Sequence, residues 1–374
     1  MSTKIKVISI FGTRPEAIKM APVVKELESR AEIDSKVCVT AQHRDMLDQV
    51  LDAFKITPDY DLDIMKPGQT LSYITAEVIK GIEEVIIKEQ PDVVLVHGDT
   101  TTATAAALAG LYQQVAVGHV EAGLRTYDKY SPFPEEMNRQ IIDCIADYLF
   151  APTETSKNNI GDKLNKNQSV FVTGNTAIDA LKTTVSDAYS NEDLDWVGEN
   201  ERLILVTAHR RENLGDPMRH IFTAIRRIVD ENPDVKVIYP VHLNPKVQTV
   251  ANEILGNNDR IKLIKPLDVL DFHNFMERAF FIMSDSGGVQ EEAPSLHKPV
   301  LVLRDTTERP EGVEAGTLKL VGTDTDAIYE AANDLLNNPK AYEEMANAKN
   351  PYGDGFASKR IVDAIIDSFA KKEA

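Results

Sequence analysis

The sequence predicts an α/β protein with two parallel-sheet domains, and three observations lead to this class. Short apolar runs alternate with longer amphipathic runs along nearly the whole chain, which is the pattern of a parallel sheet covered by helices. At 374 residues the chain is too long for one ordinary core. Clusters of polar residues follow the apolar runs, at the sheet edge where α/β proteins bind ligands.

The first domain is expected to span 1–174. Its strands are predicted over 5–11, 36–40, 93–97, 115–120, 148–151 and 170–172. Its helices are predicted over 15–29, from about Arg44 onward, and over 71–89, 100–112, 134–145 and 153–164. Pro15 suits the first turn of its helix, and Pro91 follows the end of the long third helix.

The second domain is expected to span 175–355. The segment 186–202 is polar, acidic and without periodicity, so the boundary is placed near 174–188. Strands are then predicted over 203–207, 235–239, 261–264, 280–283 and 300–303, and helices over 218–231, 245–255, 269–278, 291–296 and 327–336. A last helix, 356–372, is expected to pack back on the first domain. Both domains are therefore predicted to be Rossmann-like.

The composition narrows the classes of partner. A formal net charge of -18 argues against a nucleic-acid partner, because phosphate backbones need a basic surface. No stretch approaches the roughly 18 apolar residues of a membrane span, and the two cysteines, Cys38 and Cys144, are expected to be buried in a reducing, cytoplasmic protein. No metal-ligand spacing, G-x-G-x-x-G or P-loop motif is present, so we expect no metal and no cofactor.

A glycine-rich turn follows the strand at 280–283. Ser286, Gly287 and Gly288 lead directly into an amphipathic helix, so their backbone N–H groups are expected at its positive end, where a phosphate binds. Glu291 and Glu292 either oppose the helix dipole or accept hydrogen bonds from a sugar. The alternative is a strand-to-helix turn without a ligand.

Eight polar clusters occur at the carboxyl ends of predicted strands, four in each half of the chain. They lie at 12–16, 41–44, 97–100, 119–125, 209–212, 240–244, 284–288 and 304–309. Eight such clusters from two domains predict two sheet edges that face each other across a cleft. The alternative is two stacked domains whose strands merely end in polar residues.

Candidate catalytic residues come from these clusters. Asp99, Glu121 and Glu135 are carboxylates on neighbouring strand ends or loops, and acids that converge raise one another's pKa, which suits acid and base catalysis. Asp99 or Glu135 could equally be a helix N-terminal residue. Cations available to neutralise a diphosphate are Arg14, Lys19, His209 and Arg309, of which His209 is the best candidate. His43 and His242 are as readily structural or regulatory, and Phe272 is either a base-stacking or a core residue.

Long motifs along the chain resemble the non-hydrolysing UDP-N-acetylglucosamine 2-epimerases. They are GTRPEAIKMAP (12–22), TAQHRDMLDQVL (40–51), VLVHGDTTT (94–102), GHVEAGLRT (118–126), PEEMNR (134–139), TAHRRENLG (207–215), YPVHLNP (239–245), SDSGGVQEEAPSL (284–296) and RDTTERPEG (304–312). The resemblance covers essentially the whole chain. It implies a GT-B fold, with the nucleotide held mainly by the second domain.

The resemblance also implies an activity, the reversible conversion of UDP-GlcNAc to UDP-ManNAc without metal or nicotinamide. The C2 proton leaves as UDP departs from C1, giving 2-acetamidoglucal, and reprotonation on the other face with return of UDP gives the epimer. The product would supply ManNAc units for a cell-surface polysaccharide. Runner-up functions are a GT-B glycosyltransferase and a non-catalytic UDP-sugar sensor.

Roles for single residues follow from matching motifs, as the resemblance implies them. Proton transfer is expected from Asp99, Glu121 and Glu135, and stabilisation of the departing diphosphate from His209, Arg14 and the turn Ser286, Gly287 and Gly288. Glu292 would hold the ribose, Leu267 and Phe272 the uracil, and Lys19 and Arg309 the sugar and phosphate side. A second UDP-GlcNAc is expected as an allosteric activator at Gln42, His43, Gln69, Arg210 and His242. We also expect a homodimer.

Overall fold

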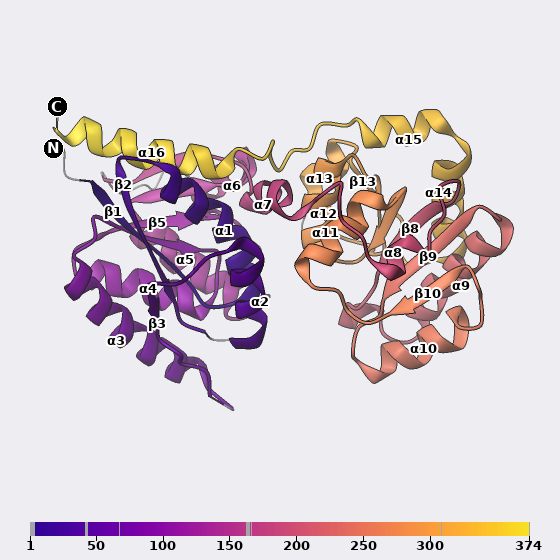
Figure 1. Cartoon of the computed structure of the whole chain (residues 1–374), viewed down its shortest axis with the longest axis horizontal. Helices are drawn as coiled ribbons and strands as arrows, with labels where there is room; N and C mark the ends of the chain where they lie inside the picture. Colours follow the sequence, from indigo (N-terminus) through magenta and orange to yellow (C-terminus); the bar gives the residue numbers. More distant parts are fainter. Residues whose placement is uncertain are drawn as a thin grey trace. The chain divides into compact units, whose positions relative to one another are not determined.

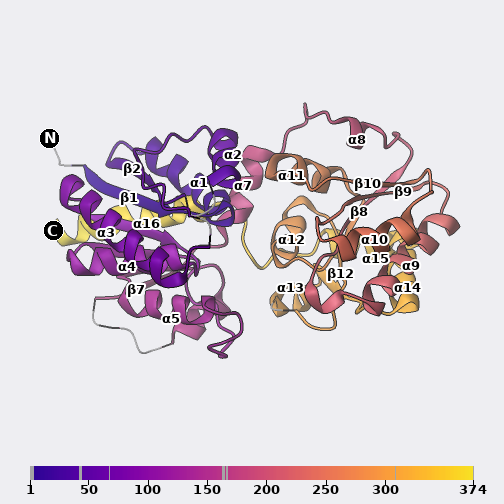
Figure 2. The ribbon, with the colours of Figure 1, turned by 90° about the horizontal axis from the view of Figure 1, so that it is seen from below.

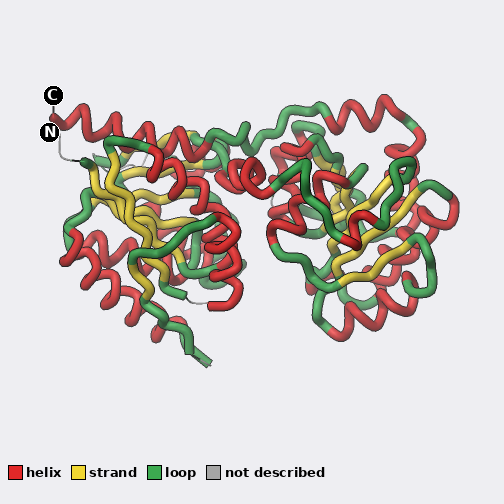
Figure 3. The backbone as a smooth tube through the Cα atoms, in the orientation of Figure 1, coloured by secondary structure: helices red, strands yellow, loops and turns green. Residues whose placement is uncertain are grey.

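The chain divides into two compact units, each described here by itself. The computed structural model describes residues 4–41, 44–66, 68–161, 165, 167–307 and 309–373. One unit is Met1–Lys182 with Gly353–Ala374, and the other is Thr183–Tyr352. The boundary between Lys182 and Thr183 lies within the range 174–188 given from the sequence. In each unit the strands form a central sheet with helices around it (Figure 3).

The first unit contains a seven-stranded sheet in the order β3-β2-β1-β4-β5-β6-β7. Its strands are β1 (Ile5–Phe11), β2 (Ile33–Val39), β3 (Tyr60–Asp61), β4 (Val93–His97), β5 (Ala116–Val120), β6 (Tyr148–Ala151) and β7 (Ser169–Val172). Every neighbouring pair is parallel. The carboxyl ends of β1, β4 and β5 therefore lie side by side at one edge.

Helices cover both faces of this sheet. They are α1 (Arg14–Ser29), α2 (Arg44–Phe54), α3 (Leu71–Glu89), α4 (Thr101–Tyr112), α5 (Glu135–Ile145), α6 (Glu154–Ile160), α7 (Thr176–Thr184) and α16 (Ala357–Glu373). The last of them, α16, runs along α1, while α3 and α4 lie on the opposite face (Figures 1 and 2). Arg30 Nη2 after α1 contacts Asp363 Oδ1 of α16 at 2.6 Å. The C-terminal helix thus belongs to the first unit.

The second unit contains a six-stranded parallel sheet in the order β10-β9-β8-β11-β12-β13. Its strands are β8 (Arg202–Thr207), β9 (Val235–Pro240), β10 (Ile261–Ile264), β11 (Phe281–Ser284), β12 (Val300–Val302) and β13 (Leu318–Leu320). The central strands are apolar along their length because both faces are buried. The predicted fold class, two parallel-sheet α/β domains, is confirmed.

The helices of the second unit also lie on both faces of its sheet. They are α8 (Glu192–Asp195), η1 (Arg211–Asn213), α9 (Asp216–Glu231), α10 (Pro245–Leu255), α11 (Val269–Arg278), α12 (Gly287–Glu292), η2 (Ala293–Leu296), α13 (Pro310–Glu314), α14 (Thr325–Asn337) and α15 (Pro339–Ala346). One face carries α9 with α10 and α14, and the other carries α11 with α12 (Figure 1). Among the described residues no helix is both long and apolar enough to cross a membrane.

Several elements were missed from the sequence, and most of these are short. The strands β3 and β13 have two and three residues, too few to show an alternating pattern. The helices α7, α13 and α15 were also missed. The expectation for the cysteines is half wrong: Cys38 is buried, but Cys144 is exposed near the end of α5.

Gly123, just after β5, is expected to resist substitution more than other glycines with a positive φ. Its φ is +85°, and a Cβ there would lie 2.1 Å from the Ser156 carbonyl oxygen. Gly123→Ala is expected to destabilise the first unit by about 3 kcal/mol through strain and overlap together. The control Gly316→Ala, with φ +80° and no described atom within 4 Å of the added Cβ, should cost only the strain, about 1 kcal/mol. Thermal unfolding tests this, and equal Tm losses would contradict it.

Candidate active site

In the first unit, the turns after β4 and β5 bring two of the predicted carboxylates to one sheet edge. Gly98 has a φ of +65°, which a glycine adopts without strain, and its N–H donates to the Val120 carbonyl at 2.9 Å. This turn presents Asp99 beside the end of β5, where Glu121 follows. Glu121 itself has a φ of +68°, a conformation that costs free energy for a residue with a side chain.

Glu121 is held between two basic side chains. Its Oε2 forms a very short ion pair with Lys19 Nζ, and His97 Nε2 lies 3.6 Å from the same oxygen. Burial alone would raise the pKa of Glu121, but the charges of Lys19 and His97 hold it well below its ordinary value. Glu121 is therefore a carboxylate at neutral pH. Lys19, predicted to lie on the sugar side, is placed at this acid.

Asp99 and Glu135 have different surroundings. Asp99 Oδ2 accepts a hydrogen bond from Arg139 Nη1 at 3.0 Å, and its backbone carbonyl accepts one from Asn138 Nδ2 at 2.8 Å. Glu135, at the first position of α5, is half-buried and has no polar partner among the described residues. The three predicted acids thus have three different surroundings: Glu121 lies between Lys19 and His97, Asp99 is paired with an arginine, and Glu135 has no partner among the described residues.

The adjacent acid Glu136 has a structural role. It is fully buried, and its carboxylate accepts the backbone N–H groups of Thr126 and Tyr127 at 2.9 and 3.2 Å. Burial would raise the pKa of Glu136, but these hydrogen bonds and Arg139 hold it lower. Glu135 and Glu136, two neighbouring acids of one motif, therefore have different roles.

Two residues near this edge were not among the candidates. Arg139 is recognisable in the sequence only as one helical turn beyond Glu135 on α5. Glu16 of α1 is buried, and its carboxylate accepts from the N–H groups of Gly12 and Thr13 at 3.1 and 2.8 Å. Burial raises the pKa of Glu16. By contrast Arg14, also on α1, has no side-chain partner among the described residues and is half-buried.

In the second unit, the turn after β11 supplies two free amides rather than three. The Ser286 N–H donates to Ser284 Oγ at 3.0 Å. The N–H groups of Gly287 and Gly288 begin α12 and have no acceptor among the described residues. A Cβ at Gly287 would lie 3.6 Å from Arg309 Nη2 and 3.8 Å from Arg210 Nη2. Two guanidinium groups therefore lie over the glycines, a strong arrangement for an anion.

His209 lies beside a buried carboxylate at the end of β8. Asp285 is fully buried, and its Oδ2 accepts the backbone N–H groups of His209 and Arg210, each at 2.8 Å, and Asn213 Nδ2 at 3.0 Å. Its other oxygen, Oδ1, is 3.3 Å from His209 Nδ1 and makes no hydrogen bond. The opposite face of the imidazole stacks on His242, with ring centroids 5.5 Å apart.

These contacts set the charge of His209. Burial lowers the pKa of His209, the Asp285 carboxylate opposes that shift, and His242 and Arg210 add to it. At neutral pH the ring is therefore neutral. His209 is therefore better described as a hydrogen-bond donor or a proton carrier than as a permanently charged cation, which the sequence had suggested.

Asp285→Asn is expected to lower the pKa of His209 further. The substitution removes the one neighbour that raises this pKa, and an amide NH₂ in place of Oδ1 can donate to the unprotonated Nδ1. The imidazole Cε1–H signal, followed by NMR against pH, should show a midpoint below about 6.5 in the native protein and a lower one in the variant. His220, which is exposed on α9, is the reference. An unchanged or raised midpoint would contradict the assignment.

The predicted nucleoside residues lie on or near α11 and α12. Glu292 Oε2 is 3.5 Å from His273 Nε2, and its other oxygen is near Gly288. Glu291 is instead used by Arg309, whose Nε donates to it over a very short distance. Leu267 and Phe272, before and within α11, are both half-buried. The structure therefore separates the two adjacent glutamates and leaves Glu292 beside the glycine turn.

The residues expected to bind an activator fall into two groups. Gln42 and His43 lie outside the described residues. Gln69 is half-buried before α3, and its Oε1 accepts from the Lys66 N–H at 3.2 Å. Arg210 and His242 lie in the second unit directly beside the glycine turn and His209. Any activator bound there would contact the same groups as the candidate anion site.

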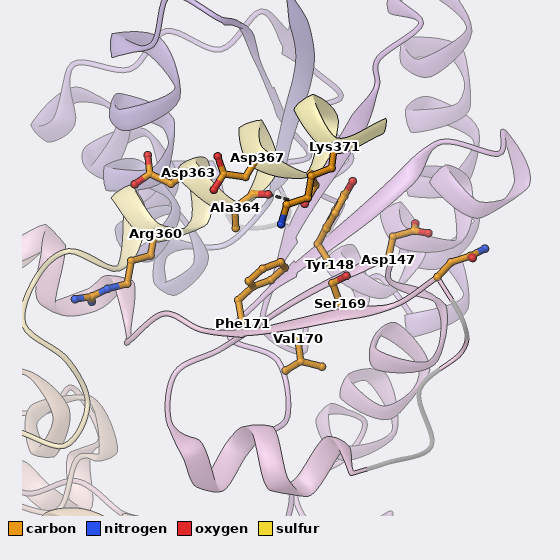
Figure 4. A pocket seen from close by; sticks show the side chains of 12 residues that line it. Asp147, Tyr148, Ser169, Val170, Phe171, Arg360, Asp363, Ala364, Asp367 and Lys371 are labelled. Carbon is orange, nitrogen blue, oxygen red and sulfur yellow. Dashed lines mark hydrogen bonds between the residues drawn. The ribbon is translucent and has the colours of Figure 1, made fainter. Parts of the chain in front are cut away.

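A cavity of about 1000 Å³ in the first unit contains none of these residues. It lies between α16 and the amino ends of β6 and β7, opposite the edge with Asp99 (Figure 4). Tyr148, Phe171 and Ala364 point into it, and Asp367 and Lys371 lie on α16 at its rim. Within the described ranges no group of three or more His, Cys, Asp or Glu side chains has a metal-binding arrangement.

Comparisons with known proteins point in one direction. Residues 25–366 match the family described as UDP-N-acetylglucosamine 2-epimerase. The protein of that name from Bacillus subtilis is 63% identical over 363 residues, which cover 97% of this chain and 95% of the relative. A crystal structure of a putative UDP-N-acetylglucosamine 2-epimerase from Listeria monocytogenes has a TM-score of 0.95 at 58% identity, covering 99% and 98% of the two chains. That of the Neisseria meningitidis enzyme bound to UDP-GlcNAc has a TM-score of 0.86 at 50% identity, covering 97% and 100%.

Proposed function

The chain belongs to the UDP-N-acetylglucosamine 2-epimerase family, and from this premise we propose that it interconverts UDP-GlcNAc and UDP-ManNAc. The observation that carries the proposal is the division of chemical groups between the two sheets. Acids capable of proton transfer lie at the edge of one sheet, and groups suited to a diphosphate lie at the edge of the other. An epimerase that eliminates and re-adds UDP needs both.

The proposed reaction begins with loss of the proton at C2 to a carboxylate. The electron pair of the C2–H bond forms a double bond between C1 and C2, and the C1–O bond breaks with its electrons on UDP. The intermediate is 2-acetamidoglucal beside UDP. Delivery of a proton to the other face of C2 and return of UDP to C1 complete the epimerisation. The carboxylates move the protons, and the anion site holds UDP until it returns.

Proton transfer is proposed for Asp99, Glu121 and Glu135. Glu121 is ionised because Lys19 and His97 neutralise it, so it can accept a proton but holds none to give before the first step. Glu135 has no side-chain partner among the described residues. We therefore propose Glu121 as a base, with Glu135 and Asp99, which Arg139 holds, as the remaining transfer groups.

UDP binding is proposed for the second unit. The Gly287 and Gly288 amides with Arg309 would hold the diphosphate, and His209 would donate to the oxygen that leaves C1. Arg14 is proposed to join them from the first unit. Glu292 would accept the ribose hydroxyls, while Leu267 and Phe272 would contact the uracil. Lys19 is proposed to keep Glu121 charged and to contact the sugar.

The test of the function uses chelator-treated protein with UDP-GlcNAc in D₂O, followed by proton NMR. We expect a new UDP-ManNAc anomeric signal and deuterium at C2 in both epimers. Free ManNAc with UDP would instead indicate hydrolysis. No reaction with UDP-GlcNAc still bound would overturn the proposal and favour a transferase or a sensor, which an acceptor screen would separate.

Allosteric activation by a second UDP-GlcNAc is proposed at Arg210 and His242, with Gln69, Gln42 and His43. Arg210→Ala is expected to convert sigmoidal kinetics into hyperbolic kinetics, because its guanidinium lies at the border of the anion site, 3.8 Å from a Cβ at Gly287. Initial rates against UDP-GlcNAc concentration measure this. Arg226→Ala, which removes an exposed ion pair on α9, is the control. Unchanged sigmoidal curves would contradict the activator site.

A homodimer is also proposed, because large apolar side chains are exposed on the surface of the first unit. Large apolar side chains are exposed on α3 and α4: Ile87 is 60%, Leu111 44% and Tyr112 61% exposed. Such side chains are common at subunit interfaces. Sedimentation of the purified protein should give twice the chain mass of 41.5 kDa, and a monomer at micromolar concentration would contradict the proposal.

A further inference from the structure

His119 is the last residue but one of β5, and its ring lies between two oxygen atoms. Its ring is fully buried. Nδ1 is 2.6 Å from Asp143 Oδ1, and Nε2 is 2.7 Å from the Gly98 carbonyl oxygen. Both are ordinary hydrogen-bond distances. Each ring nitrogen therefore needs a hydrogen bond with an oxygen, and the question is which atom supplies each proton.

Asp143 does not supply the proton of its hydrogen bond with His119, because it is an ionised carboxylate. Its Oδ2 is 2.6 Å from Arg125 Nη2 and accepts the Gly123 N–H at 3.2 Å. Burial would raise the pKa of Asp143, but its hydrogen bond with His119 and the charge and hydrogen bond of Arg125 hold it below its ordinary value. An ionised carboxylate only accepts hydrogen bonds. The proton between Asp143 and Nδ1 therefore belongs to the histidine.

Gly98 does not supply a proton to His119 either, because a backbone carbonyl is only an acceptor. The proton between this carbonyl and Nε2 is therefore also the histidine's. A neutral imidazole carries one N–H, and two acceptors require two. We infer that His119 is a buried imidazolium that positions the Gly98–Asp99 turn, and through it the carboxylate of Asp99, for the reaction proposed above. The role in catalysis rests on that proposed function, whereas the charge of the ring does not.

The contacts of the turn show how the positioning works. The Gly98 N–H donates to Val120 O and its carbonyl accepts from His119, so neighbouring residues of β5 hold the turn by both of its backbone groups. The next carbonyl, that of Asp99, is held by Asn138 of α5. Without the imidazolium, one of these three attachments is lost and the carbonyl of Gly98 is left buried and unpaired. His119 touches no substrate, because it is fully buried beneath the turn.

The charge is tested first, on the native protein. With ¹⁵N-labelled histidine at pH 8, both ring nitrogens of His119 should carry protons, and the exposed His220 is the reference signal. His119→Asn assigns the signals by their disappearance. Asp143→Asn should remove the charge that retains the second proton, and leave one N–H in the ring. A single N–H on His119 in the native protein at pH 8 would overturn the inference.

The positioning role is tested by kinetics. His119→Asn should lower kcat by about 10²-fold with KM within threefold, because a small misplacement of a catalytic group costs about that much. In Asp143→Asn the Nε2–H can stay on the Gly98 carbonyl while the amide donates to Nδ1, so kcat should stay within about threefold. His220→Asn is the control and should keep native kinetics. Native kcat in folded His119→Asn would overturn the role. If His119→Asn does not fold, His119→Gln is measured in its place. An inactive native enzyme would remove the proposed function but leave the charge measurement intact.

Discussion

Asp99→Asn is expected to lower kcat by about 10³-fold, the loss typical of removing a proton-transfer group. The asparagine oxygen can still accept from Arg139 Nη1, and the backbone of residue 99 keeps its bond from Asn138, so the fold should persist. UDP affinity should change by less than about threefold, since the groups proposed to hold UDP do not include Asp99 and, apart from Arg14, are in the other unit. Steady-state kinetics and calorimetry with UDP measure the two quantities.

A matched control for this variant is Asp52→Asn. Asp52 is exposed on α2 in the same unit and has no side-chain partner among the described residues, so its loss of charge should leave kcat unchanged. Turnover retained in Asp99→Asn would remove Asp99 from the mechanism. A parallel loss of UDP affinity would mean that the residue also binds the nucleotide.

The second large effect is expected from His209→Asn, with kcat lower by about 10²-fold or more, as when one donor to a developing oxyanion is removed. The imidazole lies 3.3 Å from Asp285, which directly precedes the glycine turn, and within the electrostatic influence of Arg210, where the leaving diphosphate is proposed to develop charge. Asparagine keeps the backbone N–H that Asp285 accepts, so the loop should stay in place. Single-turnover measurements of UDP release should show the loss in the elimination step.

The pH dependence separates this role from simple charge neutralisation. Since burial lowers the pKa of His209, the neutral ring predominates at pH 7, and the imidazolium, which is the stronger donor, forms only below about 6.5. The kcat of His209→Asn relative to that of the native enzyme should therefore fall further as the pH is lowered through that range. His220→Asn, an exposed histidine exchanged in the same way, should behave as the native enzyme. A native-like kcat in His209→Asn would contradict the proposed donor.

Much of the fold was predictable because most elements are long and strongly periodic. The helix Leu71–Glu89 and the strand Val93–His97 have the bounds that the sequence predicted, as do the helix Pro245–Leu255 and the helix Val269–Arg278. Short elements such as β13 were missed, because three residues carry too little pattern and form a strand only by pairing with a neighbouring strand.

The site was predictable in its location rather than in its contacts. Parallel strands place their carboxyl ends at one edge, so the positions of Asp99 and Glu121 follow from the order of strands and helices. Their partners do not follow. Arg139 reaches Asp99 from a helix forty residues later in the chain, and Lys19 reaches Glu121 over a separation of 102. Such contacts depend on which strands become neighbours, which local pattern does not encode.

The sequence by itself determined the fold class, the family resemblance and the set of acids and cations, because periodicity and motif are local properties of the chain. Only the tertiary structure decided the charge of each group. Glu121 is ionised because Lys19 and His97 meet it, and His209 is neutral because burial outweighs Asp285. The tertiary structure also decided that the Ser286 N–H donates to Ser284 and that His119 lies between two acceptors. A side chain's protonation depends on the atoms within a few ångströms of it, and folding, not sequence proximity, selects those atoms.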